Sequence, residues 1–190
     1  GESYEGVSSS AEVEQIAKQN NNDCKENSVC QNDNAFQGQL AEVDNEIGGS
    51  NGNYKDVSSS AKVEQKIEQE NEGCKESSFC ENTHDAQIQT ASASNLIGGG
   101  DGSYEDVSTS AEIEQIAQQE NKDCKDGSDC VNGIGGEQGF QEQSAVAVNE
   151  IGGGNGNYKD VSSSAEIEQV AQQENEGCKE ASECDNVIAT

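Results

Sequence analysis

Residues 37–47 read QGQLAEVDNEI, residues 87–97 read QIQTASASNLI, and residues 141–151 read QEQSAVAVNEI. In all three stretches every second position carries the same kind of residue, in the order Gln, Gln, Ala, Val or Ala, Asn and Ile, whereas the positions between them vary widely. Successive side chains of a β-strand point to opposite faces of the sheet, so a face that keeps its residues at a period of two indicates a strand. The three stretches therefore predict three equivalent β-strands.

These strands belong to a repeat that covers the whole chain. Each copy opens with a tyrosine and a serine-rich run, as in YEGVSSSAEVEQ from Tyr4 and YKDVSSSAKVEQ from Tyr54, and later carries two cysteines with five residues between them. The first cysteine recurs at positions 24, 74, 124 and 178, so the third step has four extra residues. They fall between Cys130 and Gln141, where an insertion indicates a loop. We divide the chain into repeats 3–52, 53–102 and 103–156 and a half repeat, 157–190, which ends before a second strand.

The serine-rich run leads into a segment whose period is ambiguous. In AEIEQIAQQEN (residues 111–121), Ile113 and Ile116 have helical spacing, and Thr109 with Glu112 matches a capping box. Across the four repeats, however, alternate positions keep the series Ala, Val or Ile, Gln, Ala or Ile, and Gln, while the residues between them change. We therefore predict a first β-strand here.

Two kinds of connection join the strands. The second strand runs through Ile-Gly-Gly into Asn51-Gly52, Asp101-Gly102 or Asn155-Gly156, dipeptides that tolerate the positive φ angles of tight turns. The link from first to second strand, residues 19–37 in the first repeat, encloses the cysteine pair and is longer than a simple hairpin needs. These lengths predict an all-β fold of tandem strand–loop–strand units (β-arches) in two facing layers, open-edged and stacking into a larger assembly.

The two layers are expected to face each other through amide and small apolar side chains. Such a core is thin, and its amides need mutual hydrogen bonds, which ladders of stacked Gln and Asn supply. The strand-face residues predicted for this interface are Val13, Gln15, Gln37, Gln39, Asn45, Val63, Gln65, Gln87, Gln89, Asn95, Ile113, Gln115, Gln141, Gln143, Asn149, Ile167 and Gln169.

Composition narrows the class of protein. Only 30% of the 190 residues are hydrophobic and the formal net charge is −28, values that also fit a disordered acidic polymer. All basic residues are lysines. The acidic balance argues against nucleic acid as a partner, because binding it needs clustered positive charge, and no apolar run approaches the length needed for membrane insertion. Diffuse uptake of divalent cations by the acidic surface is expected.

The cysteine pairs are the strongest chemical feature. An even number of regularly paired cysteines, with a single histidine in the chain, favours disulfides formed in an oxidising compartment. A bridge within each pair is favoured, because closing so short a loop costs little entropy. The alternative is a bridge between neighbouring stacked repeats or subunits, whose spacing of about 4.8 Å suits a disulfide. Zinc would need two pairs to converge on one site, so we predict no metal and no cofactor. The predicted disulfide residues are Cys24, Cys30, Cys74, Cys80, Cys124, Cys130, Cys178 and Cys184.

No group of residues predicts catalysis. His84 has no counterpart in the other repeats and no nucleophile in its sequence neighbourhood, and we interpret it as a surface residue. A lysine follows the first cysteine of every pair and is interpreted as a solvated loop residue. The glycine-rich stretches such as IGGGDGSY are partly similar to the calcium repeats of secreted β-rolls, but they lack the nine-residue period, so a plain turn is favoured. We predict no catalytic residues and no enzyme activity.

The unpaired last repeat predicts self-association. A first strand without a second strand from its own chain leaves an open sheet edge, and open edges of uniform register propagate. The chain also begins at Gly1 without an initiator methionine, which suggests a processed mature form. We therefore expect an extracellular or cell-surface structural protein whose partner is itself, in a homopolymer. The alternative is a secreted acidic repeat module that binds cations or a partner surface.

The amide- and serine-rich strand–turn–strand repeats, with their glycine turns, resemble bacterial curli-type functional amyloids, which lack these cysteines. The acidic, proline-free, cysteine-paired β repeat looks closer to the disulfide-linked tubular sheath proteins of filamentous methanogenic archaea, and the resemblance extends over the whole chain. It implies a resistant extracellular tube of stacked β hoops that encloses cells and passes small solutes. In that resemblance the eight cysteines and the Gln, Ala, Val and Asn strand faces would be the structural residues.

Overall fold

The described part of the chain consists of β-strands joined by loops. A computed structural model describes residues 3–35, 37–47, 52–85, 87–98, 101–134, 141–152 and 155–188. Among the described residues no helix is long and apolar enough to cross a membrane. The strands are β1 (Ser3–Glu5), β2 (Ser8–Asn21), β3 (Val29–Asn34), β4 (Gln37–Ile47), β5 (Asn53–Asn71), β6 (Phe79–His84), β7 (Gln87–Ile97), β8 (Ser103–Asn121), β9 (Asp129–Ile134), β10 (Gln141–Ile151), β11 (Asn157–Asn175) and β12 (Glu183–Ile188).

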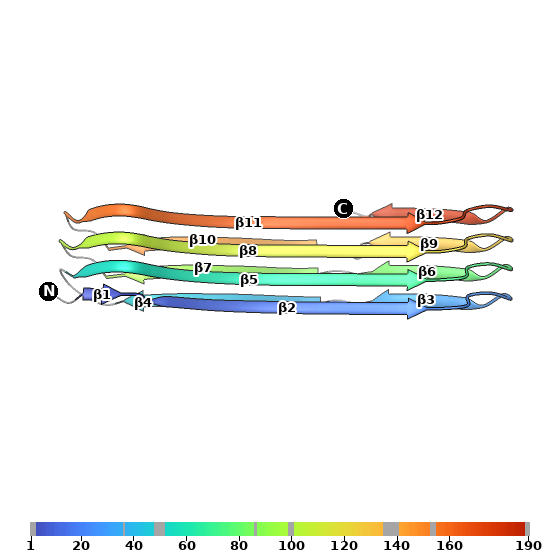
Figure 1. Ribbon diagram of the computed structural model, residues 1–190, viewed down its shortest axis with the longest axis horizontal. Helices are drawn as coiled ribbons and strands as arrows, with labels where there is room; N and C mark the ends of the chain where they lie inside the picture. The colour runs from blue at the N-terminus through green and yellow to red at the C-terminus, as the bar shows by residue number, and fades with distance from the viewer. Residues whose placement is uncertain are drawn as a thin grey trace.

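Each repeat forms one rung of a stack, and the rungs follow one another in sequence order (Figure 1). A rung consists of a long outgoing strand, a loop, and two shorter strands that return behind it in the opposite direction. The outgoing strands form sheet A, in the order β1 and β2, β5, β8, β11. The returning strands form sheet B (β3, β6, β9, β12) and sheet C (β4, β7, β10). The predicted all-β architecture of repeated strand–loop–strand units in open sheets is confirmed.

Neighbouring rungs pair in parallel and place equivalent residues on top of one another. Tyr4 pairs with Tyr54, Tyr54 with Tyr104 and Tyr104 with Tyr158. Their rings stack with centroids 5.0 to 5.3 Å apart and planes within 7° of parallel. This spacing follows from the separation of hydrogen-bonded strands, about 4.8 Å. The register is set by the repeat itself, because a slip of one residue would turn every inward side chain outward.

The interior between the two layers is thin and divided into clusters. The first cluster contains small and β-branched residues of sheets A and C, among them Ala61, Val63, Ala91 and Ile113. A second surrounds the tyrosine ladder with Val57, Val107 and Ile97, and a third consists of cysteines at the loop end of the stack. Most of the other buried side chains are amides, whose burial is costly unless they are hydrogen-bonded.

The returning half of the repeat contains a strand that the sequence analysis treated as part of a loop. The stretch after the second cysteine forms β3, β6, β9 and β12, which pair in register as sheet B. In β3 the inward positions are Cys30, Asn32 and Asn34. The four-residue insertion of the third repeat lies between Ile134 and Gln141, because these residues align with His84 and Gln87 of the second; residues 135–140 themselves are outside the described part.

Of the glycines in the expected turns, Gly102 and Gly156 do not have positive φ angles. Asn51 and the residues before Asp101 and Asn155 lie outside the described part. At Gly102 the absence of a side chain serves close packing instead, because an added Cβ would lie 1.8 Å from the carbonyl oxygen of Gly52 in the rung below. Left-handed conformations occur near the start of the outgoing strand, at Gly6, Asp56, Asp106 and Asp160, and in the cysteine loops.

Candidate functional site

The cysteines form a continuous column of sulfur along one end of the stack. The structure joins the two cysteines of every pair, with Cα–Cα distances from 6.0 to 6.5 Å, in the bonds Cys24–Cys30, Cys74–Cys80, Cys124–Cys130 and Cys178–Cys184. All cysteines of the two middle rungs are fully buried. The loop between the two cysteines of a rung is pinned to its neighbours by backbone bonds, such as Lys75 N–H to the Cys24 carbonyl at 3.0 Å.

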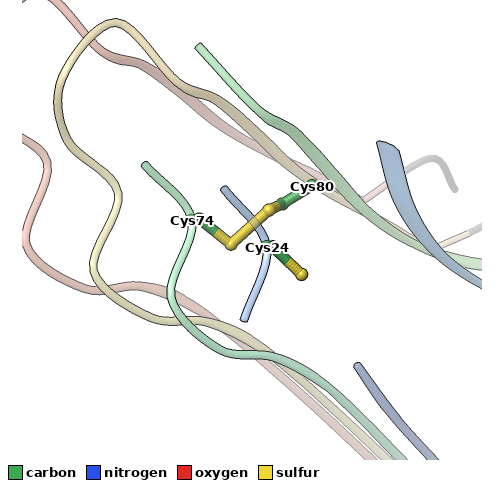
Figure 2. Close-up of side chains that lie close together, drawn as sticks. All are labelled: Cys24, Cys74 and Cys80. Carbon is green, nitrogen blue, oxygen red and sulfur yellow. A yellow bond between two sulfur atoms is a disulfide. The ribbon is translucent and has the colours of Figure 1, made fainter. Parts of the chain in front are cut away.

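Sulfur atoms of adjacent rungs also approach one another. The Sγ atoms of Cys24, Cys74 and Cys80 all lie within 4.8 Å of each other, and Figure 2 shows Cys24 beside the bond that joins the other two. The same arrangement recurs one and two rungs higher. Thiolate ligands suit soft metals, but here both sulfurs of every pair are occupied by a disulfide. Reduction of one pair would leave a thiolate next to the disulfide of the next rung, as thiol–disulfide exchange requires.

Two hydrogen-bonded columns of asparagine, one in sheet A and one in sheet B, form a double ladder beside the cysteines. Asn71 of sheet A donates to Asn82 Oδ1 across the layers at 3.0 Å and to Asn121 Oδ1 of the next rung at 2.9 Å. Asn82 donates to Asn132 Oδ1 at 2.9 Å and to the Glu120 carbonyl at 3.0 Å. These side chains are fully buried, yet every amide has partners both within its rung and in the next. The ladder therefore ties sheet A to sheet B and each rung to its neighbours. The sequence analysis did not single it out, although a Cys-x-Asn triplet recurs at the start of every sheet B strand.

The predicted strand-face residues lie between sheets A and C. Buried members in the middle rungs include Val63, Gln65, Gln89, Asn95 and Ile113. Their amides form ladders along the stack: Gln89 donates to Gln39 at 3.0 Å, and Asn95 to Asn149 at 2.9 Å. The remaining predicted positions in sheet A are Val13, Gln15, Gln115, Ile167 and Gln169, and those in sheet C are Gln37, Gln39, Asn45, Gln87, Gln143 and Asn149; the side chain of Gln141 is outside the described part.

The outer face of sheet A carries stacked charges. Lys62 lies 3.3 Å from Glu64, 3.7 Å from Glu112 and 3.8 Å from Glu114, and these carboxylates raise its pKa. Lys18 and Lys66 both bond Glu68, at 2.5 and 2.6 Å, and lower the pKa of that carboxyl group. These groups are partly exposed, so each pair contributes little alone. Together they show how lysines interrupt columns of glutamate that in-register stacking would otherwise create.

His84 is buried, and its assignment to the surface was wrong. It occupies an inward position of β6 and is 1% exposed, between Asn34 of the rung below and Ile134 of the rung above. Burial lowers the pKa of the imidazole. The reason for the error is that residues 79–84 form a strand, in which alternate residues from Cys80 onward point between the layers.

The fourth rung leaves its inward side chains open. Ile167 is 48% exposed and Tyr158 is 49% exposed, whereas their counterparts one rung below, Ile113 and Tyr104, are 0% and 1% exposed. No described strand pairs with the free edge of β11, β12 or β10. At the other end of the stack the described part of the chain likewise leaves one edge of β2, β3 and β4 without a partner. Both ends therefore present strand edges together with uncovered apolar and amide side chains.

Comparison with known proteins gives no match. No protein family model, no curated protein and no solved structure is significantly similar to this chain. The repeated β-strand units and the four disulfides fit a disulfide-stabilised structural protein.

Proposed function

We propose that this protein is an extracellular structural building block that polymerises through the edges of its parallel sheets into a resistant filament or tubular sheath. The observation that carries the proposal is the difference between middle and end rungs. A middle rung buries its tyrosine, isoleucine and amide side chains against a rung on each side, and the fourth rung offers the same side chains uncovered. Free edges with uniform register are templates for further strands of the same kind.

The disulfides support a role that demands durability. Each one closes the loop that links the two layers, so unfolding of a rung cannot separate outgoing from returning strands at that end. The amide ladders add hydrogen bonds in every direction across the interior. A tubular sheath, as in the archaeal resemblance, is the form of assembly we propose, and the paired cysteines in a proline-free acidic repeat support it.

The test is assembly of the purified protein with its disulfides intact. We expect concentration-dependent sedimentation, filaments or tubes in electron micrographs, and a fibre reflection near 4.8 Å from strand stacking. Ile167→Ser should weaken assembly, because Ile167 lies on the open end rung. Leu96→Ser is the matched control, since Leu96 is 42% exposed on the outer face of a middle rung whose edges are already paired. A monodisperse monomer at every concentration would refute the proposal.

A second candidate function is cation binding by the acidic outer surface. Glu14, Glu64, Glu114 and Glu168 stack in register along sheet A, which concentrates negative charge in one column. Divalent cations would relieve that repulsion. If this is the function, calcium should raise the melting temperature of the monomer far more than an equal ionic strength of sodium chloride does.

A further inference from the structure

The charge column that follows the tyrosine ladder alternates in sign along the stack. Its members are Glu5, Lys55, Glu105 and Lys159, which pair in register from the first rung to the fourth. Lys159 Nζ bonds Glu105 Oε1, and this carboxylate raises the pKa of the lysine. Opposite charges on neighbouring strands stabilise a sheet, and like charges destabilise it. The column therefore has a carboxylate, Glu5, in the first rung and an ammonium group, Lys159, in the fourth rung.

A second column, on the outer face of sheet A, has aliphatic side chains in both the first and the fourth rung. Its members are Ile16, Lys66, Ile116 and Val170. Ile16 is 53% exposed and has a lysine as its partner in the next rung. Val170 rests on Ile116 below and has no described residue above it. In this column the first rung has an aliphatic side chain, Ile16, without an aliphatic partner. The fourth rung has an aliphatic side chain, Val170, with no described residue on its other side.

We propose that copies of this chain join head to tail with sheets A and B in unbroken register, the first rung of one copy lying on the fourth rung of another. This inference rests on the proposed self-assembly and specifies its contact. Lys159 then pairs with Glu5 of the next copy, Val170 packs on Ile16 of that copy, and Tyr158 continues the tyrosine ladder onto its Tyr4. A contact of this type joins two different surfaces and therefore propagates without closing on itself.

The neighbouring columns are compatible with this register. Asp160, which has a positive φ, would face Gly6, so the junction avoids a pair of aspartates. Glu166 and Glu168 would face Glu12 and Glu14, but the same like-charged contacts already occur between the third and fourth rungs of a single chain. A two-fold junction between two fourth rungs would instead run the strands antiparallel and end the ladders of identical residues.

Two charge reversals test the junction by complementation. Glu5→Lys gives a copy with lysine at both ends of the column, and Lys159→Glu gives a copy with glutamate at both ends. Each variant alone should show a critical concentration for assembly raised about fivefold at low ionic strength, because every junction then opposes like charges. An equimolar mixture should return to within about twofold of the parent, since each junction between unlike variants pairs opposite charges again.

The mixture separates the junction from effects inside the chain. Glu5→Lys also opposes Lys55, and Lys159→Glu opposes Glu105, but mixing two proteins cannot relieve either contact. Lys55→Glu is the matched control, because it places like charges in the same column and leaves both end residues unchanged; its critical concentration should stay near that of the parent. A mixture that assembles no better than the single variants, while the parent assembles, overturns the head-to-tail register and leaves the proposed function standing.

Cross-linking of the parent protein provides a measurement that needs no variant. Copies labelled with nitrogen-15 are mixed with unlabelled copies, assembled, and treated with a carbodiimide that joins amines to adjacent carboxylates. We expect a Lys159–Glu5 peptide in which about half of the molecules combine a labelled with an unlabelled half, as random mixing of copies at a heterologous junction requires. The Lys159–Glu105 peptide, formed within one chain, is the internal control and should stay unmixed. Filaments that give the control peptide without the Lys159–Glu5 peptide overturn the register, and a parent that forms no assembly overturns the proposed function as well.

Discussion

Replacement of Asn82 by alanine should strongly destabilise the monomer, because its side chain is fully buried in the asparagine ladder. The Asn82 amide donates to the Glu120 carbonyl at 3.0 Å, to Asn121 Oδ1 at 3.1 Å and to Asn132 Oδ1 at 2.9 Å. Its oxygen accepts from Asn71 at 3.0 Å and from Asn32 at 2.9 Å. Each of these five bonds contributes about 1 kcal/mol net, and the partners left behind are buried, so we expect a loss of about 5 kcal/mol.

The assay is urea unfolding of the disulfide-bonded monomer, at protein concentrations below those that support assembly, with the free energy of unfolding obtained by linear extrapolation. Asn186→Ala is the matched control, because Asn186 stands in the same column on the fourth rung and is exposed. Water replaces its lost partners, so the control should lose about 1 kcal/mol or less. If both variants lose the same free energy, the ladder is not the stabilising feature that its geometry indicates.

Three further outcomes follow from single features of the stack. Gly102→Ala should cost about 3 kcal/mol in unfolding experiments, because its Cβ would collide with backbone of the rung below, whereas Gly133→Ala, with its nearest atom at 3.8 Å, should be nearly neutral. His84→Asn, which copies the first repeat, should remove the loss of stability that begins as the pH falls below about 6.5: burial lowers the pKa of the folded imidazole, so protons bind the unfolded chain first. Alkylation should label no cysteine in the native protein and eight after reduction, and reduction should cost about 2 kcal/mol per loop.

Each of these outcomes has a clear contradiction. Equal stability of the two glycine variants would mean that the backbones near Gly102 lie farther apart than the structure has them. If the free energy of unfolding of the parent protein did not change as the pH fell below about 6.5, the pKa of His84 would be the same in the folded and unfolded chains, as expected for a hydrated imidazole. Thiols that react before reduction would show that some pairs are open, and the mass of each labelled peptide would identify the rung.

The period of two carried most of the fold prediction. In residues 37–47 the inward series from Gln37 to Ile47 recurs in every complete repeat, and its burial between the layers follows directly. The first strand gave a weaker signal, since Ile113 and Ile116 also have helical spacing, and only comparison of repeats decided it. Comparison of the repeats separates the constant inward residues from the outward residues, which differ from one repeat to the next.

Sheet B was not predicted because only two of its inward positions, the cysteine and the asparagine, are the same in every rung. Val29, Phe79, Asp129 and Glu183 pair with one another in register, although nothing in their chemistry relates them. The inward Cys-x-Asn triplet was the available signal, but three residues are too few to establish a strand period by themselves. The buried position of His84 could not be read either, since the other repeats carry Asn or Ile there.

The pattern of identity and divergence between the repeats follows from parallel stacking itself. Such a stack places equivalent residues about 4.8 Å apart, a spacing that stabilises amides and aromatic rings and destabilises like charges. The cysteine, tyrosine and asparagine columns are therefore identical in all four rungs. Several charged outward columns change sign or chemistry instead, as where Lys62 separates Glu12 from Glu112.

One charged column does not change sign, and its surroundings support the same explanation. The column from Glu14 to Glu168 stays glutamate throughout, and Lys62 of the adjacent column lies within 3.8 Å of two of its members. The chain has a net charge of −28 and only ten lysines to pair with its many carboxylates. Several of these lysines occupy positions where stacking would otherwise bring glutamates of neighbouring rungs together. Four alternating positions necessarily end in opposite charges, so the column from Glu5 to Lys159 satisfies the requirement of the proposed head-to-tail junction without having been selected for it.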